Sequence, residues 1–152
     1  MANWAKRARQ ALAGELAPGE EVVAAALLQP DGTMGATVAR GAGGAIGAAI
    51  HRRTVPADHP TADSGLAATL GATAFYGVLT QHRFLVMDQA AMSGRPKGMR
   101  AVLRRADIVG FDVKKESLAD RVVITFADGT QRRLEAPGRA ARELADALFP
   151  RR

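Results

Sequence analysis

The sequence predicts an α+β protein in which about seven antiparallel strands form a barrel or roll that a C-terminal helix closes. Val122, Ile124 and Phe126 alternate with more polar residues, which is the two-residue period of a strand with one buried face. Asp128-Gly129 follows directly and is the strongest hairpin signal in the chain. Residues 139–149 place apolar side chains on one helical stripe, and a sheet with one apolar face needs such a cover.

Composition limits the classes of protein to consider. The chain has 152 residues, which fits a single domain spanning 1–152 with a sizeable core. Cysteine is absent, which excludes disulfides, thiolate catalysis and sulfur-rich metal sites and favours a cytoplasmic location. Neither the N-terminal segment nor the uncharged run 41–50 has the length of a signal-peptide core or a membrane span. The net charge of +6 favours anionic partners, although the basic residues are scattered in pairs, as on an ordinary solvated surface.

The N-terminal part begins with an expected helix within residues 1–17. Asn3 can cap it, and four apolar residues share one face at helical spacing: Trp4, Ala8, Ala11 and Leu12. Pro18-Gly19 ends this helix. Residues 20–29 are rich in Val, Ala and Leu and lie between turn signals, so they predict the first strand.

Residues 33–71 form a glycine-rich insertion, which we expect to be a helix over 33–50 followed by a loop over 51–71. Small residues recur every four positions in two rows, formed by Ala39, Gly43 and Gly47 and by Gly44 and Ala48. Such a ridge lets another backbone approach closely, and a helix this rich in glycine persists only when something packs against it. The alternatives are the protein's own barrel, a second copy of the chain, or shallow insertion into a membrane.

The C-terminal half predicts the remaining strands and the closing helix. Gln81-His82 is short enough for a tight hairpin, 93–98 is a loop, and Pro137-Gly138 introduces the last helix. The expected strands are 75–80, 83–88, 99–105, 108–114, 121–127 and 130–135.

Three short motifs give the chain a resemblance to a known family. They are the lead-in Pro18-Gly19-Glu20, the hairpin residues Leu79-Thr80 with Arg83, and Phe126 with Asp128-Gly129 before the last helix. With these motifs the chain resembles the bacterial pleckstrin-homology-like (PH-like) domain family, especially its short actinobacterial members. The resemblance implies a PH-like barrel with a capping helix, from which the insertion 33–71 departs.

The resemblance does not imply inositol-lipid binding. Phosphoinositide binders of the wider superfamily carry a Lys and an Arg-x-Arg pattern after the first strand. This chain has Pro30-Asp31-Gly32-Thr33 at that place.

No residue pattern points to catalysis, a metal or a cofactor, so we expect a protein that is not an enzyme. The three histidines, His51, His59 and His82, are not spaced as a helical zinc pair, and no serine lies in a nucleophile elbow. Three candidate acids alternate with cations, as is typical of a solvated face: Asp112, Glu116 and Asp120.

The function expected is that of a non-catalytic binding or scaffold module that self-associates or docks a protein partner, in the cytoplasm or at the inner membrane surface. The alternative is a peripheral reader of anionic phospholipid that uses Arg95, Lys97 and Arg100, which cluster in and after one loop. A nucleic-acid-binding role ranks lower because the few aromatic residues fall in predicted strands or in the first helix. An enzyme with an unrecognised site has no residue pattern in its favour, and no small-molecule substrate is indicated.

Overall fold

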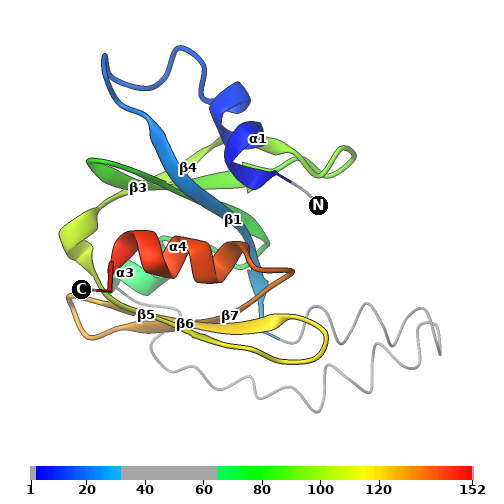
Figure 1. Cartoon of the computed structure of the whole chain (residues 1–152), viewed down its shortest axis with the longest axis vertical. Coiled ribbons are helices and arrows are strands. Elements are labelled where there is room, and N and C mark those ends of the chain that lie inside the picture. The colour runs from blue at the N-terminus through cyan, green and yellow to red at the C-terminus, as the bar shows by residue number, and fades with distance from the viewer. Residues whose placement is uncertain (1–2, 32–64, 152) are drawn as a thin grey trace.

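The computed structural model describes residues 3–31 and 65–151 (Figure 1). The predicted helix over 33–50, the loop before residue 65 and the ridge Ala39, Gly43, Gly44, Gly47 and Ala48 lie outside these residues. The helices are α1 (Trp4–Ala11), α3 (Gly65–Ala68) and α4 (Ala140–Leu148), with a 3-10 turn, η1 (Arg105–Asp107). The strands are β1 (Val22–Pro30), β2 (Phe75–Thr80), β3 (Arg83–Gln89), β4 (Pro96–Arg104), β5 (Ile108–Lys114), β6 (Asp120–Phe126) and β7 (Gln131–Ala136).

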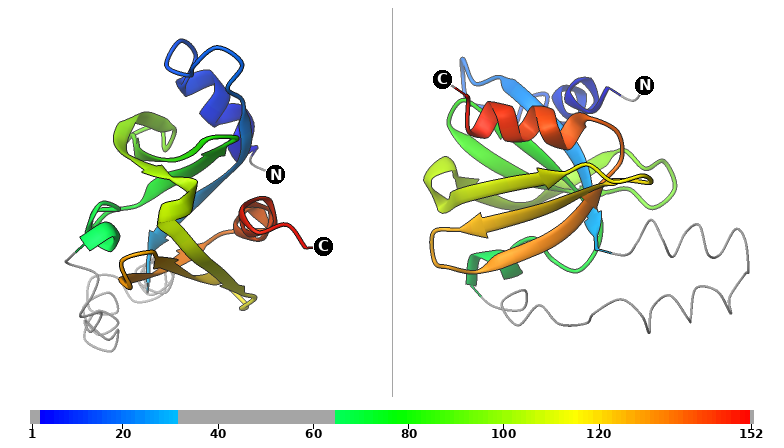
Figure 2. Two further views of the ribbon diagram at one scale, coloured as in Figure 1. Left: turned by 90° about the vertical axis from the view of Figure 1, so that its left-hand side faces the viewer. Right: turned by 60° about the horizontal axis from the view of Figure 1, so that its bottom comes forward.

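The strands form one antiparallel sheet in the order β4-β3-β2-β1-β7-β6-β5. β1 pairs with β2 from Val22 to Leu28 and with β7 at Gln29 and Pro30, so it joins the two halves of the sheet. Figure 2 shows these halves set at an angle to each other. The α+β class, the seven antiparallel strands and the C-terminal helix are therefore confirmed. β4 and β5 are the two edges of this order, so the sheet is an open one.

The first core lies between the two halves of the sheet and is covered by α4. Val122, Ile124 and Phe126 are 0%, 0% and 1% exposed, which confirms the burial that their alternation predicts. The apolar stripe of α4 packs into the same core through Ala141, Leu144 and Leu148. The buried face of the strand and the apolar stripe of the helix thus pack together in one apolar cluster.

A second core lies on the opposite face of β1, β2 and β3 and is covered by α1. Ala8 and Leu12 are fully buried there, and the Trp4 ring lies 5.6 Å from the Tyr76 ring. This confirms the apolar face predicted for the first helix. The helix ends at Ala11, earlier than expected, and the chain turns at Gly14, which has a φ of +89° that favours glycine.

Two segments predicted to be loops contain regular secondary structure. β4 begins at Pro96 because that residue pairs with Gln89, and proline is tolerated at the first residue of an edge strand. The short helix α3 lies at the end of the predicted loop 51–71. Its Leu66 N–H donates to Asp128 Oδ2 at 2.7 Å, so residues distant in sequence hold it.

Candidate functional site

A surface groove of about 580 Å³ lies between α1 and α4, with the first residues of β1 as its floor. Val23 is 48% exposed in this floor. The lining residues come from the start of α1, from β1, from the connection before α4 and from the length of α4: Asn3, Trp4, Ala5, Val23, Ala24, Ala25, Pro137, Gly138, Arg139, Ala140, Glu143 and Ala147.

The groove follows one edge of β1. Alternate β1 residues contribute to opposite cores, with Ala26 and Leu28 beneath α4 and Ala25 and Leu27 beneath α1. The two helices therefore cover opposite faces of the strand, and Figure 2 shows the β1 edge between them. The groove is thus a slot whose floor is a strand edge and whose walls are helices.

A β-bulge shapes the floor of the slot. The pairing of β1 with β2 shifts between Val22 and Ala24, which leaves Val23 as the extra residue. A bulge moves the side chains on either side of it out of simple alternation. For this reason Val22 and Ala25, three positions apart, both pack in the second core.

The lining is mainly apolar and short. Five of its members are alanine, and its charged side chains are Arg139 and Glu143, both exposed at the start of α4. The Asn3 carboxamide is already engaged, because its Oδ1 accepts the Lys6 N–H at 2.9 Å and caps α1. The Arg7 guanidinium lies 5.3 Å from the Trp4 ring centroid, beside the groove. Such a surface suits the binding of apolar chain more than the activation of a substrate.

The structure separates the three predicted anion contacts. Arg95 is exposed in the connection between β3 and β4, and Lys97 is exposed at the start of β4. The Arg100 guanidinium instead binds Asp88 Oδ1 at 2.6 Å and donates to Thr73 Oγ1 at 2.7 Å. It also donates to three backbone carbonyls, of Leu70, Thr73 and Ala74. Arg100 therefore organises the chain before β2, whereas the other two cations face solvent.

Sequence reasoning missed one feature of this hairpin. Met92 is 100% exposed at its tip, close in sequence to Arg95 and Lys97. The Tyr76 hydroxyl donates to the carbonyl of Gly94 and so fixes the base of the turn. A fully exposed methionine near two cations combines an apolar contact with positive charge.

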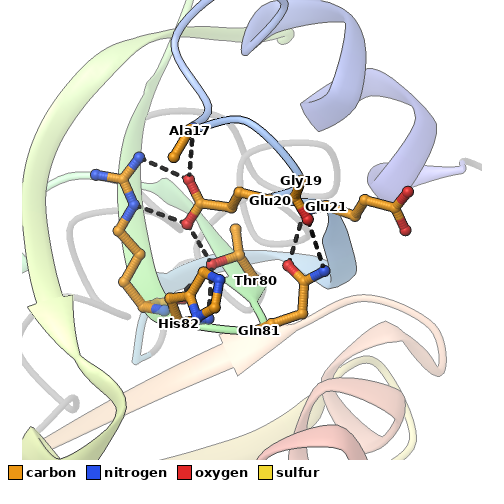
Figure 3. A network of polar contacts seen from close by, with 8 residues as sticks. Ala17, Gly19, Glu20, Glu21, Thr80, Gln81 and His82 are labelled. Carbon is orange, nitrogen blue, oxygen red and sulfur yellow. Dashed lines mark hydrogen bonds and ion pairs between the residues drawn. The ribbon is translucent and has the colours of Figure 1, made fainter.

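The Glu20 carboxylate is buried and is held by a network of polar contacts (Figure 3). Arg83 donates to both of its oxygens, at 2.9 and 3.0 Å, and the Thr80 hydroxyl donates at 2.8 Å. The Ala17 N–H adds a bond of 3.1 Å. The Arg83 hydrogen bonds, helped by those from Thr80 and Ala17, outweigh burial and lower the pKa of Glu20 to about 2.

This network explains why two of the sequence motifs occur together. Pro18-Gly19-Glu20 places a carboxylate at the start of β1, and Leu79-Thr80 with Arg83 supplies its donors from the β2–β3 hairpin. Gln81 ties the same segments, since its amide donates to Gly19 O and its oxygen accepts the Glu21 N–H. Every oxygen of Glu20 is engaged, so we assign it a structural role.

The other candidate acids are spread over three places: Asp112 lies in β5, Glu116 lies in the connection from β5 to β6, and Asp120 begins β6. Asp120 is buried and accepts from Arg142 Nε at 2.9 Å, while Glu116 lies 3.6 Å from Arg121. Among residues 3–31 and 65–151 no three potential metal-ligating side chains gather. Of the histidines, His82 is exposed in the β2–β3 turn, and the other two lie outside the described ranges. Within those ranges no helix is both long and apolar enough to cross a membrane.

The chain matches no protein-family model and no curated protein sequence.

Proposed function

We propose that this chain is a non-catalytic binding module with a PH-like fold, and that it docks a protein partner in the groove between α1 and α4. The observation that carries this proposal is the slot itself, which leaves apolar side chains of β1 open to solvent between two helices. The strand order, the closing helix and the pairing of Glu20 with the β2–β3 hairpin support the PH-like assignment.

A protein partner suits this groove better than a small substrate. Pockets for small molecules combine an apolar lining with a few convergent polar groups that fix the ligand. Here Asn3 is used by the helix cap, and Arg139 and Glu143 lie at the rim. What the groove offers is a strand edge and short apolar side chains, to which a polypeptide segment can be complementary.

Site-specific photocrosslinking tests the docking role. A benzophenone side chain at Val23 should capture a discrete protein in the native cell, because this position lies in the groove floor. The matched control is Val109 on β5, which is 55% exposed but outside the groove lining. An adduct specific to position 23 supports docking. The same adducts at both positions, or none at position 23, would reject it.

A second candidate, the peripheral reading of anionic phospholipid, is favoured by the tip of the β3–β4 hairpin. Met92 is fully exposed there, and Arg95 and Lys97, which follow closely in sequence, are exposed as well. An apolar tip with flanking cations adds burial in the lipid interface to attraction by the headgroups. Arg100 is not part of this candidate contact, because its guanidinium is bound to Asp88.

Sedimentation with vesicles containing phosphatidylserine tests the lipid contact. Binding at low salt should weaken at ~0.15 M salt, where the screening length is about 8 Å, and should weaken further in Met92→Ser. The control is Leu118→Ser, which removes an apolar side chain that is 60% exposed before β6. Equal binding to neutral vesicles, or equal loss in both variants, would exclude this contact.

A further inference from the structure

We infer that the groove binds its partner as an extended acidic segment that pairs with the edge of β1 as an additional strand. This inference rests on the docking function proposed above and names the form and the chemistry of the partner.

The backbone of β1 provides the first argument. Over Val22–Leu28 this strand pairs with β2 on one side, and among the described residues β7 pairs with its other side only at Gln29 and Pro30. In a strand, successive backbone groups point alternately to the two sides, so a strand paired on one side presents donors and acceptors on the other. Of this run, Val23, Ala24 and Ala25 line the floor of the groove. The Val22 carbonyl beside them already accepts from Arg9 at 3.2 Å, so the backbone groups available to a partner are those of the three lining residues.

The walls provide the second argument. A residue in a packed sheet occupies roughly 160 Å³, from a rise of about 3.3 Å, a strand spacing of about 4.8 Å and a sheet spacing of about 10 Å. A groove of about 580 Å³ therefore holds about four residues of a single strand. A second folded copy that paired through its own β1 would bring its own α1 and α4 to the place where these walls already stand. A lone segment fits, and a second copy paired through β1 does not.

The lining sets the chemistry of the segment. Ala5 on one wall and Ala140 and Ala147 on the other leave room for branched apolar side chains. The helix α1 carries Lys6, Arg7 and Arg9, which lie outside the lining, and no acidic residue. Arg9 donates to the Val22 carbonyl at 3.2 Å, so Lys6 and Arg7 are the cations of α1 that a partner could meet. On the α4 side, Arg139 stands at the start of the helix, with Glu143 one turn later. Acidic residues in the partner, at the positions that face α1 and Arg139, are therefore favoured over basic ones.

A designed peptide tests the inference directly. The probe is an acetylated, amidated octapeptide in which valine and glutamate alternate, and the readout is the fluorescence of Trp4, the only tryptophan, which lines the groove. We expect saturable binding and slower hydrogen exchange of the amides in 22–25. Methylating alternate amides of the probe on its pairing edge should weaken binding by about tenfold or more, because those hydrogen bonds are lost. A valine-lysine octapeptide should also bind about tenfold more weakly.

Charge variants locate the site. Arg139→Glu should weaken binding of the acidic probe by about three- to tenfold, whereas Arg133→Glu makes the same charge change on an exposed β7 residue outside the lining and should have little effect. Equal effects of the two variants would overturn the inference.

The experiments separate the two levels of the proposal. Failure of the acidic octapeptide to bind, or equal binding of its methylated form, overturns strand addition. Docking still stands if a protein is crosslinked specifically at Val23. Absence of that crosslink overturns both.

Discussion

Glu20 is a buried charged residue. Its burial is tolerated because both of its carboxylate oxygens are paired. Its side chain is 2% exposed, and Arg83 and Thr80 together engage both oxygens. Removing one partner of such a pair costs more than the pair contributes, because an unpaired charge stays buried. The site therefore joins the start of β1 to the β2–β3 hairpin with high geometric specificity.

The lowered pKa of Glu20 predicts an acid-dependent loss of stability. Since the folded-state pKa is about 2 and the ordinary value is 4.5, the contribution is complete above about pH 4.5 and is lost as the pH falls toward 2. With Arg83 partly solvated, we expect the loss to be about 2 kcal/mol of unfolding free energy. Urea unfolding from pH 7 to pH 2 measures it.

Glu20→Gln should remove this part of the pH dependence. The lowered pKa values of Asp107 and Asp128 act in the same direction, so the difference between wild type and variant isolates Glu20. Glu15→Gln, a change at an exposed carboxylate in the same connection, is the control and should leave the pH dependence of the unfolding free energy unchanged. If Glu20→Gln and the wild type showed the same pH dependence of the unfolding free energy, the structural role assigned to Glu20 would be contradicted.

Gly77 is required by packing in the first core. A Cβ atom at this position would lie 2.8 Å from Phe84 Cζ and 3.1 Å from Leu28 Cδ1. Gly77→Ala should therefore destabilise the protein by about 1–3 kcal/mol in chemical denaturation. Gly98→Ala, also in a strand, meets no described atom within 4 Å and should change stability by less than about 0.5 kcal/mol. Equal changes of stability in the two variants would mean that the core side chains move to accept a Cβ atom at position 77.

At this scale, local contacts could be predicted and distant ones could not. The Asn3 cap follows from residues three positions apart, and it is confirmed by the bond to the Lys6 N–H. Arg100 was predicted to contact an anion because it follows a basic loop. Its carboxylate partner, Asp88, comes from the neighbouring strand, and its carbonyl partners come from 26 to 30 residues earlier in the chain.

Among the elements, two β-rich runs are predicted best. Residues 75–80 and 108–114 match β2 and β5 at both ends, although β2 is buried along its whole length and shows no alternation. Helix α3 was not predicted, since its four residues carry no period of their own. It is held by Asp128 and Thr130 from the β6–β7 turn, which accept the N–H groups of Leu66 and Ala67.

Removal of the Asp128 carboxylate should loosen α3 selectively. Its Oδ2 accepts the Leu66 N–H at 2.7 Å, and its Oδ1 orders Thr130 through bonds of 3.0 and 2.6 Å. In Asp128→Ala we expect faster hydrogen exchange over residues 66–70 and little change in β2 and β3, because local openings are governed by local contacts. Uniformly faster exchange throughout the chain would show that this cap is part of the global fold.

Over the whole molecule, the class and the closing helix follow from the sequence, whereas the arrangement of two cores does not. The run Val22–Leu28 is apolar on both faces because α1 and α4 cover opposite sides of it, but the same composition fits any buried strand. The pairing of β1 with β7 joins residues more than a hundred positions apart. The groove depends on how α1 and α4 pack beside the first residues of β1, and α4 is distant from β1 in sequence, so the groove could not be predicted. The small-residue ridge, including Gly43 and Gly47, stays a prediction.

Because β1, β2 and β3 contribute to both cores, we expect the two cores to unfold together. Trp4 reports on the second core through its contact with Tyr76, and far-ultraviolet circular dichroism reports on the sheet. Their denaturation curves should coincide in the wild type. Leu12→Ala in the second core and Leu144→Ala in the first should each cost about 2–5 kcal/mol and shift both curves equally, since both side chains are fully buried. If Leu12→Ala shifts only the curve followed by Trp4 fluorescence, α1 detaches before the sheet unfolds. The helix that forms one wall of the groove would then unfold independently of the sheet.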